Sequence, residues 1–336
     1  MRAEPISSMI RRLLTHATIA ALGVLTIVGS GGGAIGFPDI DYGGGGGSVP
    51  LSPYVQVFPF RPTVQAGAIV KFEANAINAT PPLSYQWRRS GVDITGATGP
   101  TYTLGGAQLG DDGTQFTVVV SAANGIATGG VVLLVSPLPG VVFQDADFPV
   151  SNWTVTATAQ PAQNGPTHTE SQASDGGNPD PYRSITYQMT PGPSSLRLDH
   201  FAVAAMYDPA IQGAIYTIDL EEQCSRRSFS SGLTFTGLSQ APMFEQAGRT
   251  YQPRAWSGSC LLGSSSWSGM RMSSLKADEF VLSGPPCGTS EKCPDFSATA
   301  PPLRFGFVTQ LGLAAGSPAG FLVQGIDNWK VTVWRR

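Results

Sequence analysis

Two stretches decide the fold class of the first half of the chain: SYQWRR at residues 84–89 and DDGTQFTVVVS at residues 111–121. The first contains two aromatic residues and the second a run of β-branched residues, and a further run at residues 70–75 alternates apolar with polar residues. Such alternation predicts a strand with one buried face. Because about seven of these runs, bounded by Gly, Pro and Asp, lie between residues 53 and 136, we expect a Greek-key sandwich there.

The same residues resemble the immunoglobulin-like domains of bacterial secreted proteins. The resemblance implies that Trp87 is the core tryptophan of such a domain over residues 53–137, and that Ala74 and Val118 occupy the two positions where antibody-type domains place their disulfide. Neither position is Cys, so we expect apolar packing around Trp87 to hold this domain together. A domain of this kind is typical of spacers and adhesion modules, and its fold alone does not define a ligand.

The second half of the chain, residues 140–336, is rich in short Val, Ile, Phe and Tyr runs and has almost no helical periodicity. So many short strands in one domain predict a two-sheet jelly-roll β-sandwich, and the whole chain is expected to be all-β. The opening segment around Asp145 and Trp153 and the closing segment GIDNWKVTV at residues 325–333 carry a second resemblance. They resemble jelly-roll domains of secreted bacterial proteins related in architecture to concanavalin-like lectins and carbohydrate-binding modules, most of which have no assigned activity.

Composition excludes several classes of protein. The chain has 336 residues, of which 13% are charged and 41% hydrophobic, with a net charge of −3. The hydrophobic content supports a packed core, while basic residues occur in runs no longer than pairs, so no nucleic-acid footprint is present. The three His and four Cys lack the spacings of common zinc sites.

The N-terminal fifty residues predict export. Three Arg precede an apolar run at residues 13–28, which is the order of a secretory signal, so residues 1–30 are interpreted as a signal peptide or an uncleaved N-terminal anchor. The end of this run resembles a bacterial lipoprotein leader, but Ser30 stands where the lipidated Cys would be. Residues 31–52 are a Gly-rich linker. The expected location is secreted or in the cell envelope (bacterial periplasm, outer surface or extracellular), with membrane contact only through an uncleaved N-terminal segment.

All four Cys lie in the second half, and an even count in an exported chain predicts two disulfides. Cys287 and Cys293 are close in sequence, which favours pairing them with each other and Cys224 with Cys260. Three connectivities remain open.

No cofactor is required by the sequence, but a structural calcium ion is one hypothesis. The first and last strands of such sandwiches often lie side by side, and Asp145, Asp147 and Asp327 would supply oxygen ligands there. The alternative is that these Asp residues cap turns.

Catalysis has one candidate, the cluster Asp219, Glu221 and Glu222. Retaining glycosidases need two nearby carboxyl groups, and Asp219 and Glu221 would share one face of a strand. The cluster departs from the acid pattern of concanavalin-like glucanases because the first Glu of that pattern is missing. His168 and His200 have no Gly-x-Ser-x-Gly elbow nearby, so a serine-hydrolase triad is not supported.

Binding has a broader set of candidates. Carbohydrate modules stack aromatic rings on sugars and use polar side chains for the hydroxyls. The residues proposed for this role are Trp256, Trp267, Tyr251, Arg254 and Tyr182.

The sequence therefore predicts an extracellular or cell-surface binding or adhesion protein that recognises a glycan or a surface partner through its C-terminal jelly roll, without turnover and without nucleic acid. The alternatives are a carbohydrate-active enzyme, glycosidase or lyase, using the acidic cluster, and a non-catalytic structural envelope protein.

Overall fold

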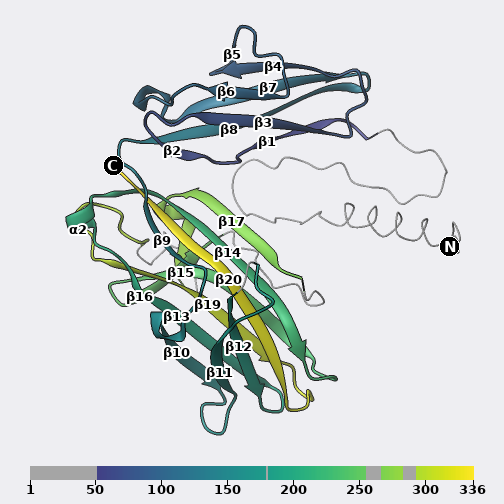
Figure 1. Cartoon of the computed structure of the whole chain (residues 1–336). Coiled ribbons are helices and arrows are strands. Elements are labelled where there is room, and N and C mark those ends of the chain that lie inside the picture. Colours follow the sequence, from purple (N-terminus) through teal and green to yellow (C-terminus); the bar gives the residue numbers. More distant parts are fainter. Residues whose placement is uncertain (1–50, 179–180, 255–265, 283–292) are drawn as a thin grey trace, which may run out of the picture. The chain divides into compact units, whose positions relative to one another are not determined.

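The computed structural model describes residues 51–178, 181–254, 266–282 and 293–336, which belong to one compact unit (Figure 1). Regular structure in these residues is almost entirely β-strand, so the all-β prediction is confirmed. The helical elements are α2 (Pro209–Gln212) and three 3-10 turns, η1 (Leu109–Asp111), η2 (Val150–Asn152) and η3 (Ala277–Glu279). None of the helices in the described part of the chain has the length and apolar character needed to cross a bilayer.

The first part of the unit is a β-sandwich of a three-stranded and a five-stranded sheet, in the orders β1-β3-β6 and β2-β8-β7-β4-β5. Only β2 and β8 pair in parallel among these strands. This arrangement of sheets is that of an immunoglobulin-like sandwich. The strands are β1 (Tyr54–Phe58), β2 (Thr63–Gln65), β3 (Val70–Ile77), β4 (Ser84–Arg89), β5 (Val92–Asp93), β6 (Thr101–Leu104), β7 (Thr114–Ala122) and β8 (Gly125–Ser136).

Trp87 is the centre of this sandwich, as the sequence predicts. Its side chain is fully buried on β4, packs near Phe72 and Tyr102, and donates its indole N–H to the carbonyl of Gly99 at 3.0 Å. Val118 lies opposite Trp87 in the β4–β7 register and is also fully buried, and Ala74 packs against the same core. Apolar contact therefore takes the place of the inter-sheet disulfide.

A second, larger sandwich follows. Its sheets have the orders β10-β13-β19-β15-β16-β18 and β11-β12-β20-β14-β17, and β9 pairs with β20. Residues of both sheets share one hydrophobic core. The strands are β9 (Val141–Asp145), β10 (Trp153–Gln160), β11 (Thr167–Ala173), β12 (Tyr182–Met189), β13 (Ser194–Tyr207), β14 (Ile215–Phe229), β15 (Phe235–Gln246), β16 (Arg249–Pro253), β17 (Ser268–Leu275), β18 (Phe280–Leu282), β19 (Leu303–Leu313) and β20 (Gly320–Arg335).

Buried polar contacts join the two sandwiches. The hydroxyl of Thr63 lies 2.5 Å from that of Ser274 on β17 and 3.1 Å from that of Thr217 on β14. Ser136 at the end of β8 donates its hydroxyl to the carbonyl of Arg335 at 2.6 Å. These buried hydrogen bonds link side chains and backbone of both sandwiches.

Candidate functional site

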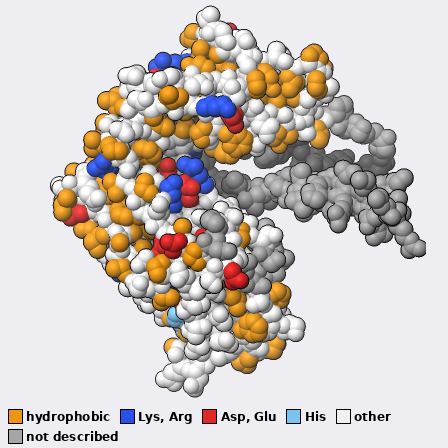
Figure 2. All heavy atoms as spheres, viewed as in Figure 1, with side chains coloured by type: hydrophobic (Ala, Val, Ile, Leu, Met, Phe, Trp, Pro, Cys, Tyr) orange, Lys and Arg blue, Asp and Glu red, His pale blue; other side chains and the backbone are white. Residues whose placement is uncertain are grey.

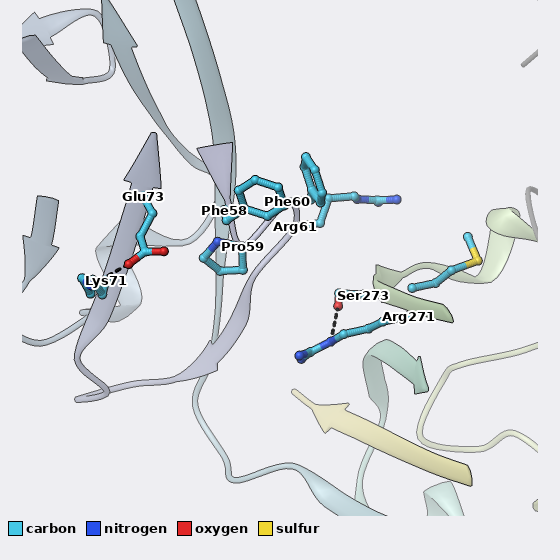
Figure 3. A pocket seen from close by; sticks show the side chains of 9 residues that line it. Phe58, Pro59, Phe60, Arg61, Lys71, Glu73, Arg271 and Ser273 are labelled. Carbon is cyan, nitrogen blue, oxygen red and sulfur yellow. Dashed lines mark hydrogen bonds and ion pairs between the residues drawn. The ribbon is translucent and has the colours of Figure 1, made fainter. Parts of the chain in front are cut away.

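A groove of about 620 Å³ is lined by residues of both sandwiches (Figure 3). One wall comes from the end of β1, the segment at residues 59–61 and the outward face of β3; the other comes from β17. The lining residues are Phe58, Pro59, Phe60, Arg61, Lys71, Glu73, Arg271, Met272 and Ser273.

Two neighbouring aromatic rings form the apolar part of this groove. Phe58 is 37% exposed and Phe60 is 57% exposed, and their ring centroids are 4.3 Å apart. The alternation of β1 explains the first of them, because Val57 points into the core and the next side chain must point outward. Pro59 then ends the strand and brings Phe60 beside Phe58.

Charged and polar groups flank the rings. On β3 the ammonium of Lys71 lies 2.5 Å from a carboxylate oxygen of Glu73. On β17 Arg271 donates to the hydroxyl of Ser273 at 3.3 Å and lies 3.6 Å from Glu221. The groove thus places aromatic faces beside hydrogen-bond donors and acceptors, the combination that sugar hydroxyls and pyranose faces require.

Arg61 fixes one side of the groove. Its guanidinium donates to both carboxylate oxygens of Glu279, at 2.6 and 2.9 Å, and to the carbonyl of Ser274 at 3.2 Å. Burial opposes ionisation of Glu279, but the hydrogen bonds from Arg61 and from the backbone of Lys276, together with the positive charges of both residues, outweigh it and hold the pKa of Glu279 below its ordinary value. A bidentate pair of this kind fixes geometry as well as charge, so the groove is built by its own side chains.

The sequence-predicted carbohydrate residues are distributed differently. Tyr251 is 3% exposed and stacks on Phe244 in the core, so its ring does not face solvent. Arg254 is exposed and donates to the carbonyl of Asp278 at 3.1 Å. Trp256 lies outside the described residues. Among the members of this set that the structure describes, the rings of Trp267 and Tyr182 are in contact.

Trp267 lies on the outer face of β20. Its ring meets Tyr182 edge-on at 5.3 Å, and its indole N–H donates to the carbonyl of Gly176 at 2.9 Å. A Cβ at Gly325 would lie 2.9 Å from the Trp267 ring and 3.1 Å from Tyr182, so the glycine makes room for both rings. Trp267 is partly exposed at this place and stays a candidate for ligand contact.

An amide cluster lies near this tryptophan on β14, β20 and the turn before β12. Asn178 donates its amide to the side-chain oxygen of Gln223 at 2.9 Å, and Asn328 donates to the same oxygen at 3.1 Å. With Glu221 and Arg271, Gln223 and Asn328 line a small depression of about 200 Å³. The polar groups that glycan recognition requires are therefore present beside Trp267 as well.

The proposed calcium ligands make hydrogen bonds as turn-capping residues do. Asp145 accepts backbone N–H groups from Asp147 and Phe148 at 3.1 and 2.7 Å, and the indole N–H of Trp153 at 2.9 Å. Asp327 is buried and accepts the backbone N–H of Asn178 at 2.6 Å. Within the described residues, no group of three His, Cys, Asp or Glu side chains is placed to hold a metal ion.

Calcium binding by Asp145, Asp147 and Asp327 stays a prediction with a direct test. If these carboxylates hold the ion, chelation with EGTA should lower the melting temperature, because a ligand that binds only the folded state stabilises it. Differential scanning calorimetry with and without EGTA measures the shift, and Asp327→Asn should abolish it. An unchanged melting temperature would contradict the calcium site.

The acidic cluster on β14 is divided between two environments. Asp219 is buried and accepts the backbone N–H of Ser274 at 2.6 Å and the indole N–H of Trp334 at 3.0 Å; burial raises its pKa. Glu221 is partly exposed and lies 3.3 Å from Lys330. Glu222 points into the sandwich core, on the opposite face of the strand. Each acid thus has its own structural partner.

Cys224 and Cys293 are both disulfide-bonded. Cys260 and Cys287 lie outside the described residues, so the predicted pairing stays a prediction.

Sequence reasoning missed the paired rings of Phe58 and Phe60. The signal was the alternation of β1, which places Val57 inward and Phe58 outward. The contribution of β17 could not be found in this way. Arg271 reaches the groove only because the two sandwiches pack against each other in the folded chain.

Comparison with known proteins identifies no family. No protein-family model matches the chain, and no curated protein matches it. Solved structures similar to the chain include the N-terminal four immunoglobulin domains of Dscam1 isoform 6.9, with 17% identity and a TM-score of 0.22, covering 25% of this chain and 21% of that one. They also include the N-terminal eight immunoglobulin domains of Down syndrome cell adhesion molecule isoform 1.30.30, with 12% identity and a TM-score of 0.23, covering 59% and 33%. The chain therefore spans at most a third of these proteins, and scores this low carry no argument about its fold or function.

Proposed function

We propose that this chain is an extracellular or cell-surface binding protein that recognises a glycan without turnover. The observation that carries the proposal is the groove in which the exposed rings of Phe58 and Phe60 lie beside Lys71, Glu73 and Arg271. Exposed aromatic side chains have few rotatable bonds, so they lose little conformational entropy when a sugar stacks on them. Adjacent charged groups then orient the sugar hydroxyls. The partly exposed Trp267 supports the same function on a second surface.

The character of the surface supports a neutral or weakly charged ligand. On the face drawn in Figure 2, charged side chains form a few small groups within a surface of apolar and uncharged atoms. This pattern agrees with the charged fraction of only 13%. Binding should accordingly depend weakly on salt, unlike binding to nucleic acid.

The enzyme alternative, a glycosidase or lyase using the acids of β14, receives less support. Asp219 is buried with two donors on its carboxylate, and Glu222 points away from Glu221. A pair of acids across a sugar bond must share one open site. Release of reducing sugar from a bound glycan, lost in Glu221→Gln, would favour this alternative.

A glycan array followed by titration of the strongest ligand tests the proposal. Phe60→Ala should weaken binding roughly tenfold, the effect of losing about 1.4 kcal/mol of stacking. The matched control is Tyr54→Ala, which removes an exposed aromatic ring on β1 outside the groove and should leave affinity unchanged. Equal loss in both variants, or a silent array, would contradict a glycan site in this groove.

A further inference from the structure

A layer of hydrogen-bonded polar side chains crosses the apolar core of the second sandwich. One sheet contributes His200, Thr309 and Gln240, and the facing sheet contributes Tyr187, Gln324 and Glu222; none of these six is more than 4% exposed. Glu170 and Arg183 extend the layer at one end. Burying a polar side chain costs free energy unless hydrogen bonds compensate for the lost water, and an apolar side chain would avoid that cost. The presence of this layer therefore requires an explanation.

Strand register places Thr309 directly opposite Gln240. The two residues are directly opposed on β19 and β15, and both point inward, in step with the core residues Leu311 and Leu238. Directly opposed residues of an antiparallel pair have Cβ atoms about 4.5–5.5 Å apart, so the side chains share one space.

The groups that would activate the Thr309 hydroxyl surround it. The Nε2 atom of His200 lies 3.4 Å from Oγ1 of Thr309, and Nδ1 of His200 lies 3.3 Å from a carboxylate oxygen of Glu170. Arg183 pairs with the other oxygen of that carboxylate. Burial, reinforced by the charge of Arg183, holds the pKa of His200 well below its ordinary value, so the imidazole is neutral. Nucleophile, base and acid thus lie in the order that acyl transfer uses, although neither Nδ1 of His200 nor the facing carboxylate oxygen has a hydrogen-bond partner in the described part of the chain.

Hydrogen bonds fix both the oxygen and the nitrogen of the Gln240 side-chain amide. Its carbonyl oxygen accepts the amide N–H of Gln324 at 2.9 Å, the place of an oxyanion donor. Its nitrogen donates to a carboxyl oxygen of Glu222 at 2.5 Å. Burial raises the pKa of Glu222 to about 8 despite that hydrogen bond, so the acid carries a proton at neutral pH. Its second oxygen has no hydrogen-bond partner in the described part of the chain.

We propose that Thr309 and Gln240 form an intramolecular ester that links β19 to β15. Oγ1 of Thr309 attacks the side-chain carbonyl carbon of Gln240 while His200 takes the hydroxyl proton, and the N–H of Gln324 stabilises the oxyanion. The C–N bond then breaks as the departing nitrogen takes the proton of Glu222, and the proton that His200 took from Thr309 balances the charge left on Glu222. One O–H and one C–N bond are lost, one C–O and one N–H bond are formed, and ammonia leaves, so neither an oxidant nor a co-reactant is needed. The side chains described above are those of the chain before this step.

Two features of the site favour a stable product. The layer lies in a core closed by apolar side chains of both sheets, so water that would hydrolyse the ester is excluded. The link also joins adjacent central strands of one sheet, where it opposes separation of the strands by force or heat.

A tryptic digest of the purified full chain tests the proposal. Gln240 lies in the peptide 228–249 and Thr309 in the peptide 305–330. The expected result is one joined species whose mass is the sum of the two peptides less one ammonia, and hydroxylamine should separate it. The separate, unmodified peptides from folded protein would overturn the proposal. If the peptide 305–330 loses ammonia without being joined to the other peptide, the choice of Gln240 is overturned. Thr309 would then have reacted with Gln324, which lies in the same peptide.

Variants then test the assigned roles. Thr309→Val and His200→Gln should each leave the two peptides separate, whereas Thr217→Val, a buried threonine outside the layer, should leave the joined species intact. Joining that persists in Thr309→Val would overturn the assignment of the nucleophile. The wild-type digest decides the proposal by itself, so a variant that fails to fold leaves it testable.

Discussion

Replacing Trp87 with Ala should lower the free energy of unfolding of the first sandwich by about 3–5 kcal/mol. The side chain is fully buried, and its ring centroid lies 6.2 Å from that of Phe72 and 6.1 Å from that of Tyr102. Truncation would open a cavity among these rings and leave the carbonyl of Gly99 without its indole donor. No disulfide spans Ala74 and Val118 to limit the damage. Urea denaturation followed by circular dichroism measures the change.

Trp87→Phe is the matched control for this prediction. Phenylalanine keeps much of the ring volume but loses the hydrogen bond to Gly99, so its effect should be clearly smaller than that of alanine. A loss below about 1 kcal/mol in the alanine variant would contradict the view that packing around Trp87 replaces the inter-sheet cross-link.

The parts of the fold that the sequence predicts are those with apolar alternation. The apolar-rich run Tyr182–Met189 forms β12, and Phe280–Leu282 forms β18. The first sandwich could be predicted as immunoglobulin-like because one tryptophan and one long alternating strand define its core. In these segments burial of a single face determines the backbone conformation, and the sequence records that burial directly.

The strands that the sequence missed are polar or interrupted. β11 has the sequence THTESQA, which lacks an apolar face, and β15 contains Pro242. β14 continues well beyond Asp219 and Glu221, which the sequence places on one strand, and ends at Phe229. Pairing with strands distant in the sequence supplies the missing stabilisation, and no local pattern reports such pairing.

The polar layer illustrates the same limit at the level of a site. His200 shares its parity with Leu196 and Leu198, so its inward direction could be read from alternation alone. Its proximity to Thr309 and Glu170 could not, because Thr309 is on the neighbouring strand of the same sheet and Glu170 is on the facing sheet. Single polar residues in apolar strands are thus the signal worth following when a β-sandwich has no recognisable motif.

Glu222→Gln should remove a large pH dependence of stability. The pKa of Glu222 is raised by burial from 4.5 to about 8 in the folded chain, so between these values the folded state holds a proton that the unfolded state has lost. The contribution of this proton to stability is therefore complete below about pH 4.5, falls as the pH rises, and is gone above about pH 8. A shift of this size corresponds to about 5 kcal/mol over the whole window.

The measurement is the difference in free energy of unfolding between the wild type and Glu222→Gln at several pH values from 4.5 to 8.5. Glutamine keeps an acceptor oxygen for Gln240 and does not titrate, so groups common to both proteins cancel and the difference should shift steadily in favour of the variant as the pH rises. If only one of the two proteins carries the Thr309–Gln240 cross-link, its free energy of unfolding changes by the same amount at every pH. The slope of the difference against pH is then unchanged. Glu221→Gln on the same strand is the matched control, because its side chain is partly exposed and lies outside the polar layer. A flat difference for Glu222→Gln would mean that the buried acid is ionised in the folded chain, and the proton source required for the departure of ammonia would then be missing.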